Sequence, residues 1–248
     1  MKKKIWGAVL IVAGIVFIAA AVLLVMMLYP TDSSKKYIHH QKQVTTVNKA
    51  SNHDIDWNQI RKDNKDIYAW LYVPKTKVDY AVVQPTKKEG DLFYLNRNLK
   101  KNYEFAGSIF SEGMNSKDFS DPVTVLYGHN MLNGTMFATL HKFRKPGFFK
   151  KNKYMYIFQP HKKLTYKIYA AYEYDDRHIM NSFDFDKKKV RMKYFKSTLK
   201  PKAFAKNTRK VKLSEDSKIL TLSTCVSGNN SSKRYLVQGV LEKYEQTD

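Results

Sequence analysis

The stretch KILTLSTCVSGNNSSKRYLVQGVLEKY, residues 218–244, contains two runs rich in apolar and β-branched residues, separated by a polar, glycine-containing loop. This pattern predicts a β-hairpin. The first run ends at Cys225 and the second begins at Arg234. If the hairpin turns between residues 229 and 230, Cys225 lies directly opposite Arg234, and both side chains project from the same face of the sheet. A register shifted by one residue would place Arg234 on the opposite face.

Cys225 is the one cysteine of the chain, so an intramolecular disulfide is impossible. In an exported protein, a leftover cysteine suggests either intermolecular pairing or a reactive thiol. A guanidinium opposite the thiol would favour the nucleophilic thiolate and donate hydrogen bonds to a developing oxyanion. A lone cysteine is, however, more often a small buried apolar side chain than a nucleophile. The pair alone therefore leaves both interpretations open.

A thiol that attacks an amide needs a proton donor for the departing amine, and histidine is the usual one near neutral pH. Among seven histidines, His129 is the best placed, because the strand expected at 123–127 runs directly into Gly128 and His129. Such a strand end projects the imidazole beside a turn that glycine permits. His178, at the start of a long insertion, remains an alternative. The others are expected in the stalk or on a lysine-rich surface: His39, His40, His53, His141 and His161.

Six further runs are rich in aromatic and β-branched residues and are separated by turn-forming residues. They cover residues 70–73, 78–84, 107–110, 123–127, 154–158 and 164–174. With the hairpin they give eight short strands, which favour a mainly β fold with a closed or nearly closed antiparallel barrel. Peripheral helices are expected at 136–143 and 185–203. The second is amphipathic and basic, and we expect it to pack on the barrel rather than lie on a membrane surface.

The N-terminal part of the chain has a different composition. Ile5 to Tyr29 carry no charge and would form roughly 37 Å of helix, more than the ~30 Å hydrocarbon core of a bilayer. Three lysines precede this run, as in a signal peptide. The run is, however, longer than the apolar core of a signal peptide. We therefore expect residues 1–29 to be a cytoplasmic tip and an uncleaved single-pass anchor, 30–53 an extracellular stalk, and 54–248 a domain outside the cell membrane.

The formal net charge of +22 raises the question of an anionic partner. Clustered Lys and Arg bind nucleic acid, but an exported protein rarely meets it, so we expect no nucleic-acid partner. Anionic lipids or wall polymers would fit the same charge, and a solvated basic surface is the plainest interpretation. The sequence has no paired Cys or His spacing of the zinc type and no carboxylate-dense loop. We therefore predict no metal and no cofactor.

Three motifs together resemble the active-site signatures of sortases, in that family's order of His, Cys and Arg. They are LYGHN at 126–130, TLSTC at 221–225, and a basic pair ending in Arg234. The TLSTC form is similar to that of class B sortases, as is the long helical insertion between 174 and 211. Further similar segments are AWLYVP at 69–74, VDYAVVQ at 78–84, FYL at 93–95 and AGSIF at 106–110. Ala81 departs from the class pattern, which has proline there.

The resemblance implies a sortase-type barrel and a cysteine transpeptidase that recognises a C-terminal sorting signal on secreted proteins. Cys225 would attack the carbonyl after the signal's Thr to form a thioester, and Arg234 would hold the substrate and stabilise the oxyanion. His129 would protonate the departing amine and later deprotonate the incoming one. Leu95, Ser223 and Thr224 would shape the substrate groove. The expected signal is of the Asn-Pro-x-Thr type, and the acceptor is an amine of a peptidoglycan precursor or of a pilin.

Two other functions fit less of the sequence. A papain-like wall peptidase carries its cysteine at a helix N-terminus and before its histidine, whereas here a strand carries Cys225 and His129 comes first. A membrane-tethered, non-catalytic protein that binds anionic envelope polymers would explain the charge. It would not explain the order and agreement of the three motifs.

Overall fold

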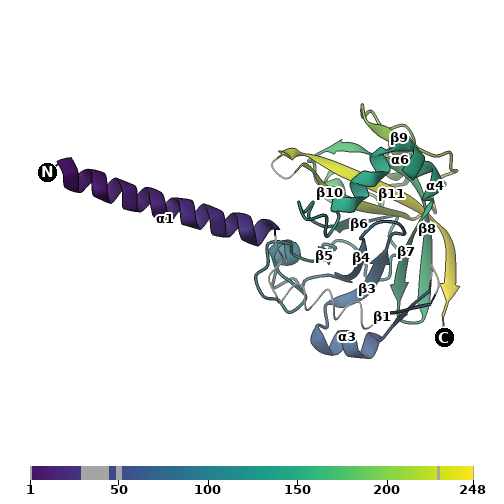
Figure 1. The fold of residues 1–248 in the computed structure, drawn as a ribbon. Coiled ribbons are helices and arrows are strands. Elements are labelled where there is room, and N and C mark those ends of the chain that lie inside the picture. Colours follow the sequence, from purple (N-terminus) through teal and green to yellow (C-terminus); the bar gives the residue numbers. More distant parts are fainter. Residues whose placement is uncertain (1, 29–44, 49–51, 228–229, 248) are drawn as a thin grey trace.

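In this computed structural model, a long N-terminal helix and a small two-stranded sheet precede a β-barrel that carries short helices on its outside (Figure 1). The barrel, its helices and their connecting loops contain all of the predicted site residues. The structure describes residues 2–28, 45–48, 52–227 and 230–247.

Helix α1 (Lys2–Leu28) covers the stretch predicted as an anchor. Among the described residues, no helix is both long enough and apolar enough to cross a membrane. The anchor and the location of the domain stay predictions.

The predicted stalk contains regular structure near its end. Strand β1 (Thr45–Asn48) pairs antiparallel with β2 (Asn52–Ile55), so the expected domain boundary at residue 54 lies within a strand. The polar composition of the predicted stalk gave no signal for this pairing. The rest of the stalk, residues 30–44 and 49–51, lies outside the described residues.

The described part of the chain forms a nine-stranded mixed sheet in the order β11-β10-β6-β5-β4-β3-β7-β8-β9, and an additional β11–β8 pairing closes all but β9 into a barrel. The strands are β3 (Ile67–Tyr72), β4 (Asp79–Val83), β5 (Ile109–Phe110), β6 (Val123–Tyr127), β7 (Tyr154–Gln159), β8 (Lys162–Asp175), β9 (Lys206–Thr208), β10 (Ile219–Ser227) and β11 (Asn230–Gln246). The predicted closed barrel is confirmed.

The expectation of a wholly antiparallel barrel is wrong at two places. Strands β4 and β5 pair in parallel, and so do β6 and β10. In both cases a long connection returns the chain to the same end of the barrel, as parallel neighbours require. Because β6 and β10 run the same way, the segments that follow His129 and Cys225 leave the barrel at the same rim.

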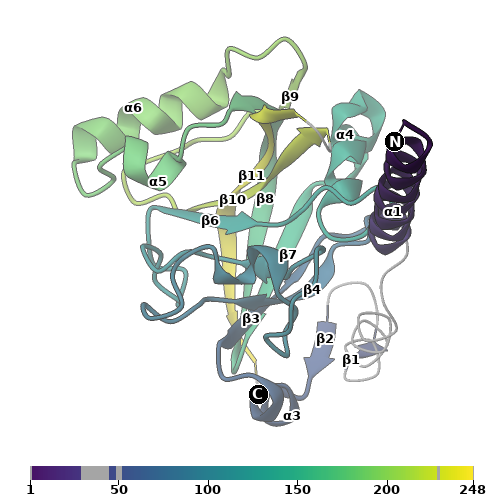
Figure 2. The same ribbon diagram turned by 90° about the vertical axis from the view of Figure 1, so that its left-hand side faces the viewer.

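Short helices fill the connections: α3 (Trp57–Asp63), η1 (Phe93–Asn96), η2 (Ala138–Arg144), α4 (Pro146–Lys151), α5 (Ile179–Ser182) and α6 (Lys188–Leu199). The helix expected at 136–143 is the 3-10 helix η2, and the one expected at 185–203 is the shorter α6. Figure 2 shows α5 and α6 together on the outside of the barrel. Tyr194 and Phe195 of α6 are buried against the barrel strands and its lysines are exposed, so the expected packing is confirmed.

The alternation of side-chain directions along β10 and β11 decides which face of the barrel Cys225 and Arg234 occupy. Leu222 and Tyr235 belong to the apolar cluster inside the barrel, whereas Leu236 packs outside it, beneath the α5–α6 region. Since successive side chains point to opposite faces, Cys225 and Arg234 fall on the outer face. The site therefore lies on the barrel wall and not in its interior.

Candidate active site

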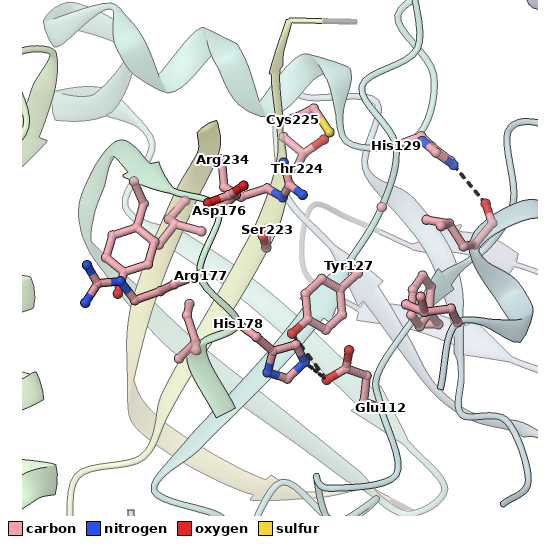
Figure 3. Close-up of a pocket in the computed structure, with 17 residues that line it drawn as sticks. Glu112, Tyr127, His129, Asp176, Arg177, His178, Ser223, Thr224, Cys225 and Arg234 are labelled. Atoms are coloured by element: carbon pink, nitrogen blue, oxygen red, sulfur yellow. Dashed lines mark hydrogen bonds and ion pairs between the residues drawn. The ribbon is translucent and has the colours of Figure 1, made fainter. Parts of the chain in front are cut away.

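A cavity of about 330 Å³ opens on this outer face, between the ends of β6, β10 and β11 and the η1 and α5 segments. All six predicted site residues line it (Figure 3): Leu95, His129, Ser223, Thr224, Cys225 and Arg234. The structure thus brings together residues that are up to 139 positions apart in the sequence (Leu95 to Arg234).

The hairpin places Cys225 directly opposite Arg234, as the sequence register predicted. Beyond Cys225 the ladder has an irregularity, and Ser227 pairs with Asn230. Cys225 is a free, half-buried thiol. A guanidinium held on the same face as a thiol can stabilise negative charge on the sulfur and on an oxyanion beside it.

His129 lies at the other side of the cavity, and its Nε2 is 2.8 Å from the carbonyl oxygen of Leu95. A carbonyl only accepts, so Nε2 carries the proton and, in the neutral ring, Nδ1 carries the lone pair. Figure 3 shows this hydrogen bond directed away from Cys225. Burial lowers the pKa of His129, and the Leu95 hydrogen bond partly opposes that shift. The neutral imidazole is therefore favoured near pH 7.

The Leu95 carbonyl is held by a close approach of the chain at Gly107. Gly107 has φ +59°, and a Cβ there would overlap the carbonyl oxygens of Leu95 and Tyr94. The amide of Ser108 donates to the Tyr94 carbonyl at 3.0 Å, and Phe105 stacks on the His129 ring with centroids 5.5 Å apart. Phe105 therefore positions the ring of His129, and the AGSIF segment that follows it positions the acceptor of that ring.

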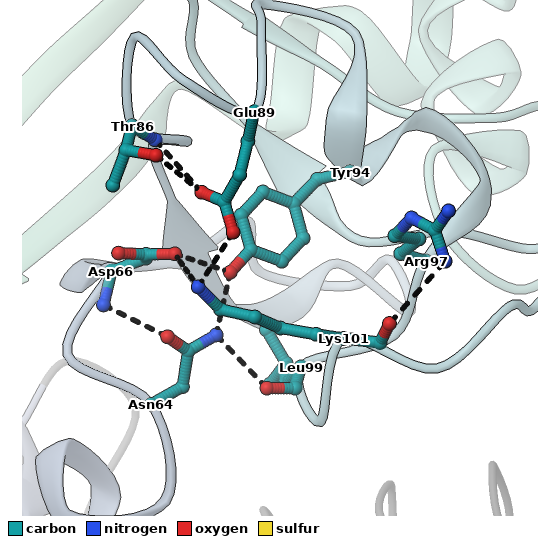
Figure 4. Close-up of polar contacts among 8 residues, drawn as sticks. All are labelled: Asn64, Asp66, Thr86, Glu89, Tyr94, Arg97, Leu99 and Lys101. Carbon is teal, nitrogen blue, oxygen red and sulfur yellow. Dashed lines mark hydrogen bonds and ion pairs between the residues drawn. The ribbon is translucent and has the colours of Figure 1, made fainter.

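A group of polar side chains, which we call the η1 clamp, fastens η1 to the start of β3 (Figure 4). The clamp consists of Asn64, Asp66, Glu89, Tyr94 and Lys101. The Tyr94 hydroxyl donates to Asp66 at 2.6 Å and accepts from the Asn64 amide at 2.8 Å. Lys101 Nζ lies 2.8 Å from both carboxylates. The Lys101 hydrogen bond lowers the pKa of Glu89 to about 2.

The floor of the cavity contains an acid–histidine pair that the sequence did not reveal. Glu112 is buried, and His178 Nε2 lies 2.6 Å from its carboxylate, while the Tyr127 hydroxyl donates to it at 3.4 Å. The amide of Asn181 donates to His178 Nδ1 at 3.0 Å, which caps α5. His178, the alternative histidine, therefore lines the cavity but is bonded to Glu112. Glu112 follows a predicted strand with no distinguishing motif.

His141 corrects an expectation. The sequence placed it on a lysine-rich surface, but it is half-buried and its Nε2 lies 3.0 Å from the carbonyl oxygen of Cys225. The neighbouring Lys142 is exposed as expected. Local lysine density does not indicate which side of a short helix one residue occupies, and here that side faces β10. His161 is exposed, as predicted.

Among the described residues, no group of three or more His, Cys, Asp or Glu side chains is arranged to hold a metal ion.

The model of the sortase domain family matches residues 71–242 of this chain. The chain belongs to the sortase family. Sortases are cysteine transpeptidases, and the matched range contains the whole cavity lining from Leu92 to Leu236.

The similar proteins are class B sortases. Sortase B of Listeria monocytogenes is 30% identical to this sortase over 207 residues, which are 81% of this chain and 79% of the relative. The crystal structure of Clostridium perfringens sortase B shares 31% identity with a TM-score of 0.66, over 75% of this chain and 99% of that one. A Streptococcus pyogenes class B sortase involved in pilus biogenesis shares 29% identity with a TM-score of 0.64, over 76% and 98%.

Proposed function

We propose that this sortase cleaves a C-terminal sorting signal after its Thr, through a thioester on Cys225, and transfers the secreted protein to an amine. The observation that carries the proposal is the direct pairing of Cys225 with Arg234 beside a cavity that His129 also lines. That arrangement supplies a nucleophile, an oxyanion donor and a proton carrier on one surface.

In the first half-reaction the Cys225 thiolate attacks the carbonyl carbon after Thr, and the carbonyl oxygen becomes an oxyanion that Arg234 stabilises. The tetrahedral species collapses, the C–N bond breaks, and His129 delivers a proton to the departing amine. The neutral ring gains this proton at Nδ1 from the Cys225 thiol, which thereby becomes the attacking thiolate. The resulting imidazolium gives the proton to the amine and returns to the neutral state. The product is a thioester and a released peptide.

In the second half-reaction an acceptor amine attacks the thioester and His129 takes its proton, so that an amide forms and the Cys225 thiolate leaves. Water in place of the amine would release the protein by hydrolysis. The acceptor is an amine of a peptidoglycan precursor or of a pilin. Wall anchoring and pilus assembly require the same chemistry and differ only in that nucleophile.

The substrate groove is formed by Leu95, Ser223 and Thr224 around the thiol. Thr224 Oγ1 is buried and has no hydrogen-bond partner among the described residues. Alternation along β10 places this side chain on the inner face of the barrel with Leu222, whereas Ser223 shares the outer face with Cys225. Ser223 and Leu95 are therefore proposed to contact the substrate through their side chains, and Thr224 to support the wall of the groove. The signal that we propose is of the Asn-Pro-x-Thr type, as the resemblance to class B sortases implies.

We further propose that α1 anchors the enzyme in the cell membrane with the barrel outside the cell. Large apolar side chains of α1 are exposed, including Val12, Phe17 and Leu24, and the hydrophobic effect favours transferring such a surface into lipid. Fractionation of cells, followed by protease treatment of intact protoplasts, tests this. A soluble protein, or one protected from the protease, would contradict the proposal.

The function is tested by incubating the purified protein with pentapeptide-containing substrates of the Asn-Pro-x-Thr and Leu-Pro-x-Thr types and trapping the acyl-enzyme by mass spectrometry. We expect an adduct on Cys225 with the first type, which an added wall-peptide amine or pilin lysine then removes. Cys225→Ala should form no adduct. If Cys225→Ala still transfers peptide, the proposed nucleophile is wrong. If the protein binds anionic polymer but never acylates, the non-catalytic alternative is favoured.

A further inference from the structure

The main chain at Cys225 is less supported by the sheet than the rest of β10. The parallel pairing of β10 with β6 ends at Ser223, opposite Tyr127. On the other side, the ladder with β11 shifts register just after Cys225. The peptide group that follows Cys225 therefore lacks a strand neighbour on the β6 side. This is the main chain next to the proposed nucleophile.

Two side chains take the place of the missing strand. Asn130 Nδ2 donates to the Cys225 carbonyl at 3.2 Å, and His141 Nε2 lies 3.0 Å from the same oxygen. Because a carbonyl only accepts, His141 donates its Nε2 proton. Asn130 comes from the segment after β6 and His141 from η2, so both hydrogen bonds cross between elements that are far apart in sequence.

The surroundings of His141 keep its ring neutral, with the proton on Nε2. Its ring packs on Tyr235 with centroids 4.7 Å apart, and Arg144 lies over the same tyrosine and pairs with Glu173 at 3.0 Å. Burial, and then the nearby charge of Arg144, lower the pKa of His141. The hydrogen bond to the Cys225 main chain and the negative charge of Glu173 act in the opposite direction. His141 Nδ1 is buried and has no partner among the described residues. Protonation there would add an unpaired buried charge, which is costly.

We propose that His141 is a positioning residue of this sortase: as a neutral donor it fixes the carbonyl of Cys225, and thereby directs the thiol toward the cavity and Arg234. This proposal rests on Cys225 being the nucleophile. It assigns no proton transfer to His141, because its donor nitrogen faces the main chain and not the reacting atoms. His141 thus contacts the main chain of Cys225, while His129 lines the cavity.

The consequence is kinetic, because the rate of a thiol attack depends steeply on the placement of the sulfur. A displacement of about 1 Å can cost on the order of 100-fold in rate. Loss of one of two donors to the carbonyl should displace the sulfur less than this. We therefore expect an effect of about tenfold on kcat, with the substrate KM little changed.

The test compares three variants of the full chain: His141→Leu, His141→Gln and Lys142→Leu. Leucine removes the donor and roughly keeps the volume, and glutamine returns an amide N–H to about the same position. Lys142→Leu introduces the same side chain at the neighbouring, exposed position of η2, which does not contact Cys225. Each variant is measured for kcat and KM with the acylating peptide, for melting temperature, and for the rate at pH 7 at which iodoacetamide alkylates Cys225.

We expect His141→Leu to lower kcat about tenfold and to slow alkylation, and His141→Gln and Lys142→Leu to stay within about threefold of the wild type. Wild-type kcat and alkylation in His141→Leu would overturn the proposal. So would equal losses in the Leu and Gln variants together with equally lowered melting temperatures, because that pattern indicates a purely structural role. Alkylation needs no peptide, so a wild type that is alkylated but never acylated would refute the proposed function and leave this inference to be decided by the alkylation rates.

Discussion

The two sides of the cavity are held in different ways. Cys225 and Arg234 lie on adjacent strands, and β11 is in turn paired with β8, so a hydrogen-bonded ladder sets their separation. His129 lies beyond the end of β6, and its ring is held by the Leu95 carbonyl and Phe105. The nucleophile therefore depends on strand register, and the proton carrier depends on loops that the η1 clamp and Gly107 fix.

This difference in support predicts how each side of the cavity responds to a substitution. A ladder tolerates the loss of one contact because its neighbours maintain the register. A loop held by a few polar contacts moves when one of them is lost. Four substitutions, taken in order of decreasing expected effect, can break or sharpen this contrast.

Arg234→Ala tests the ladder side. We expect kcat/KM for acylation to fall on the order of 100- to 1,000-fold, because an oxyanion donor is lost, with no large change in melting temperature. Arg234→Lys should recover only part of the activity, since an ammonium lacks the planar fork of donors. Steady-state kinetics with the peptide substrate measure both. An Arg234→Ala variant with more than half of the wild-type activity would remove Arg234 from the mechanism.

Gly107→Ala tests the loop side. The added Cβ overlaps the Leu95 carbonyl, so the acceptor of His129 must move, and we expect kcat to fall about tenfold or more. Gly90→Ala is the matched control, because Gly90 also has positive φ, at +81°, but nothing lies within 4 Å of its added Cβ. The control should lose roughly 1 kcal/mol of stability and little activity. Equal activities in the two variants would contradict the role of the Leu95 carbonyl.

Tyr94→Phe tests the η1 clamp. Removal of the hydroxyl leaves the buried Asn64 amide and the Asp66 carboxylate each without one partner. We expect the free energy of unfolding in urea to fall by about 1 to 3 kcal/mol. The effect on kcat should be smaller than that of Gly107→Ala, since Gly107 still approaches Leu95. Tyr103→Phe, at an exposed tyrosine, is the control and should change neither quantity.

The pH dependence of the clamp should be the smallest effect. The pKa of Glu89 is lowered to about 2 in the folded protein by Lys101, below the ordinary value of about 4.3. A depressed carboxyl pKa contributes stability that is present above the ordinary value and is lost as the pH falls through about 2. The melting temperature of the wild type should therefore exceed that of Glu89→Gln at about pH 6, and the difference should shrink toward about pH 2. A difference that stays constant with pH would show that Glu89 does not act through this charge.

Much of the ladder side was predictable from the sequence. The strand expected at 123–127 is β6 at those bounds, and Cys225 pairs with Arg234 as expected. The assumed count across the turn does not hold beyond that pair, because a register shift follows Cys225 and Ser227 pairs with Asn230. Both expectations rest on local features: a period of two along a strand, and a count of residues across a turn. The assignment of His129 depended instead on the resemblance of its motif.

The loop side was not predictable in the same way. The η1 clamp joins Asn64 and Asp66 to residues about 30 positions later, and no periodicity records such contacts. The parallel pairing of β6 with β10 depends on how long connections return the chain, and the expectation of an antiparallel barrel did not include it. His141 was misplaced because its environment comes from β10 and β11, far along the chain.

The parallel pairing of β6 with β10 also bears on how the enzyme is made. These strands are neighbours in the barrel but are separated in sequence by β7, β8, α6 and β9. Contacts of such long range form slowly, since the chain between them must be ordered first. Strand β10 inserts between β6 and β11, which are made at very different times during synthesis. A nascent chain therefore carries His129 long before it has a nucleophile, and the site becomes competent only when the last strands are in place.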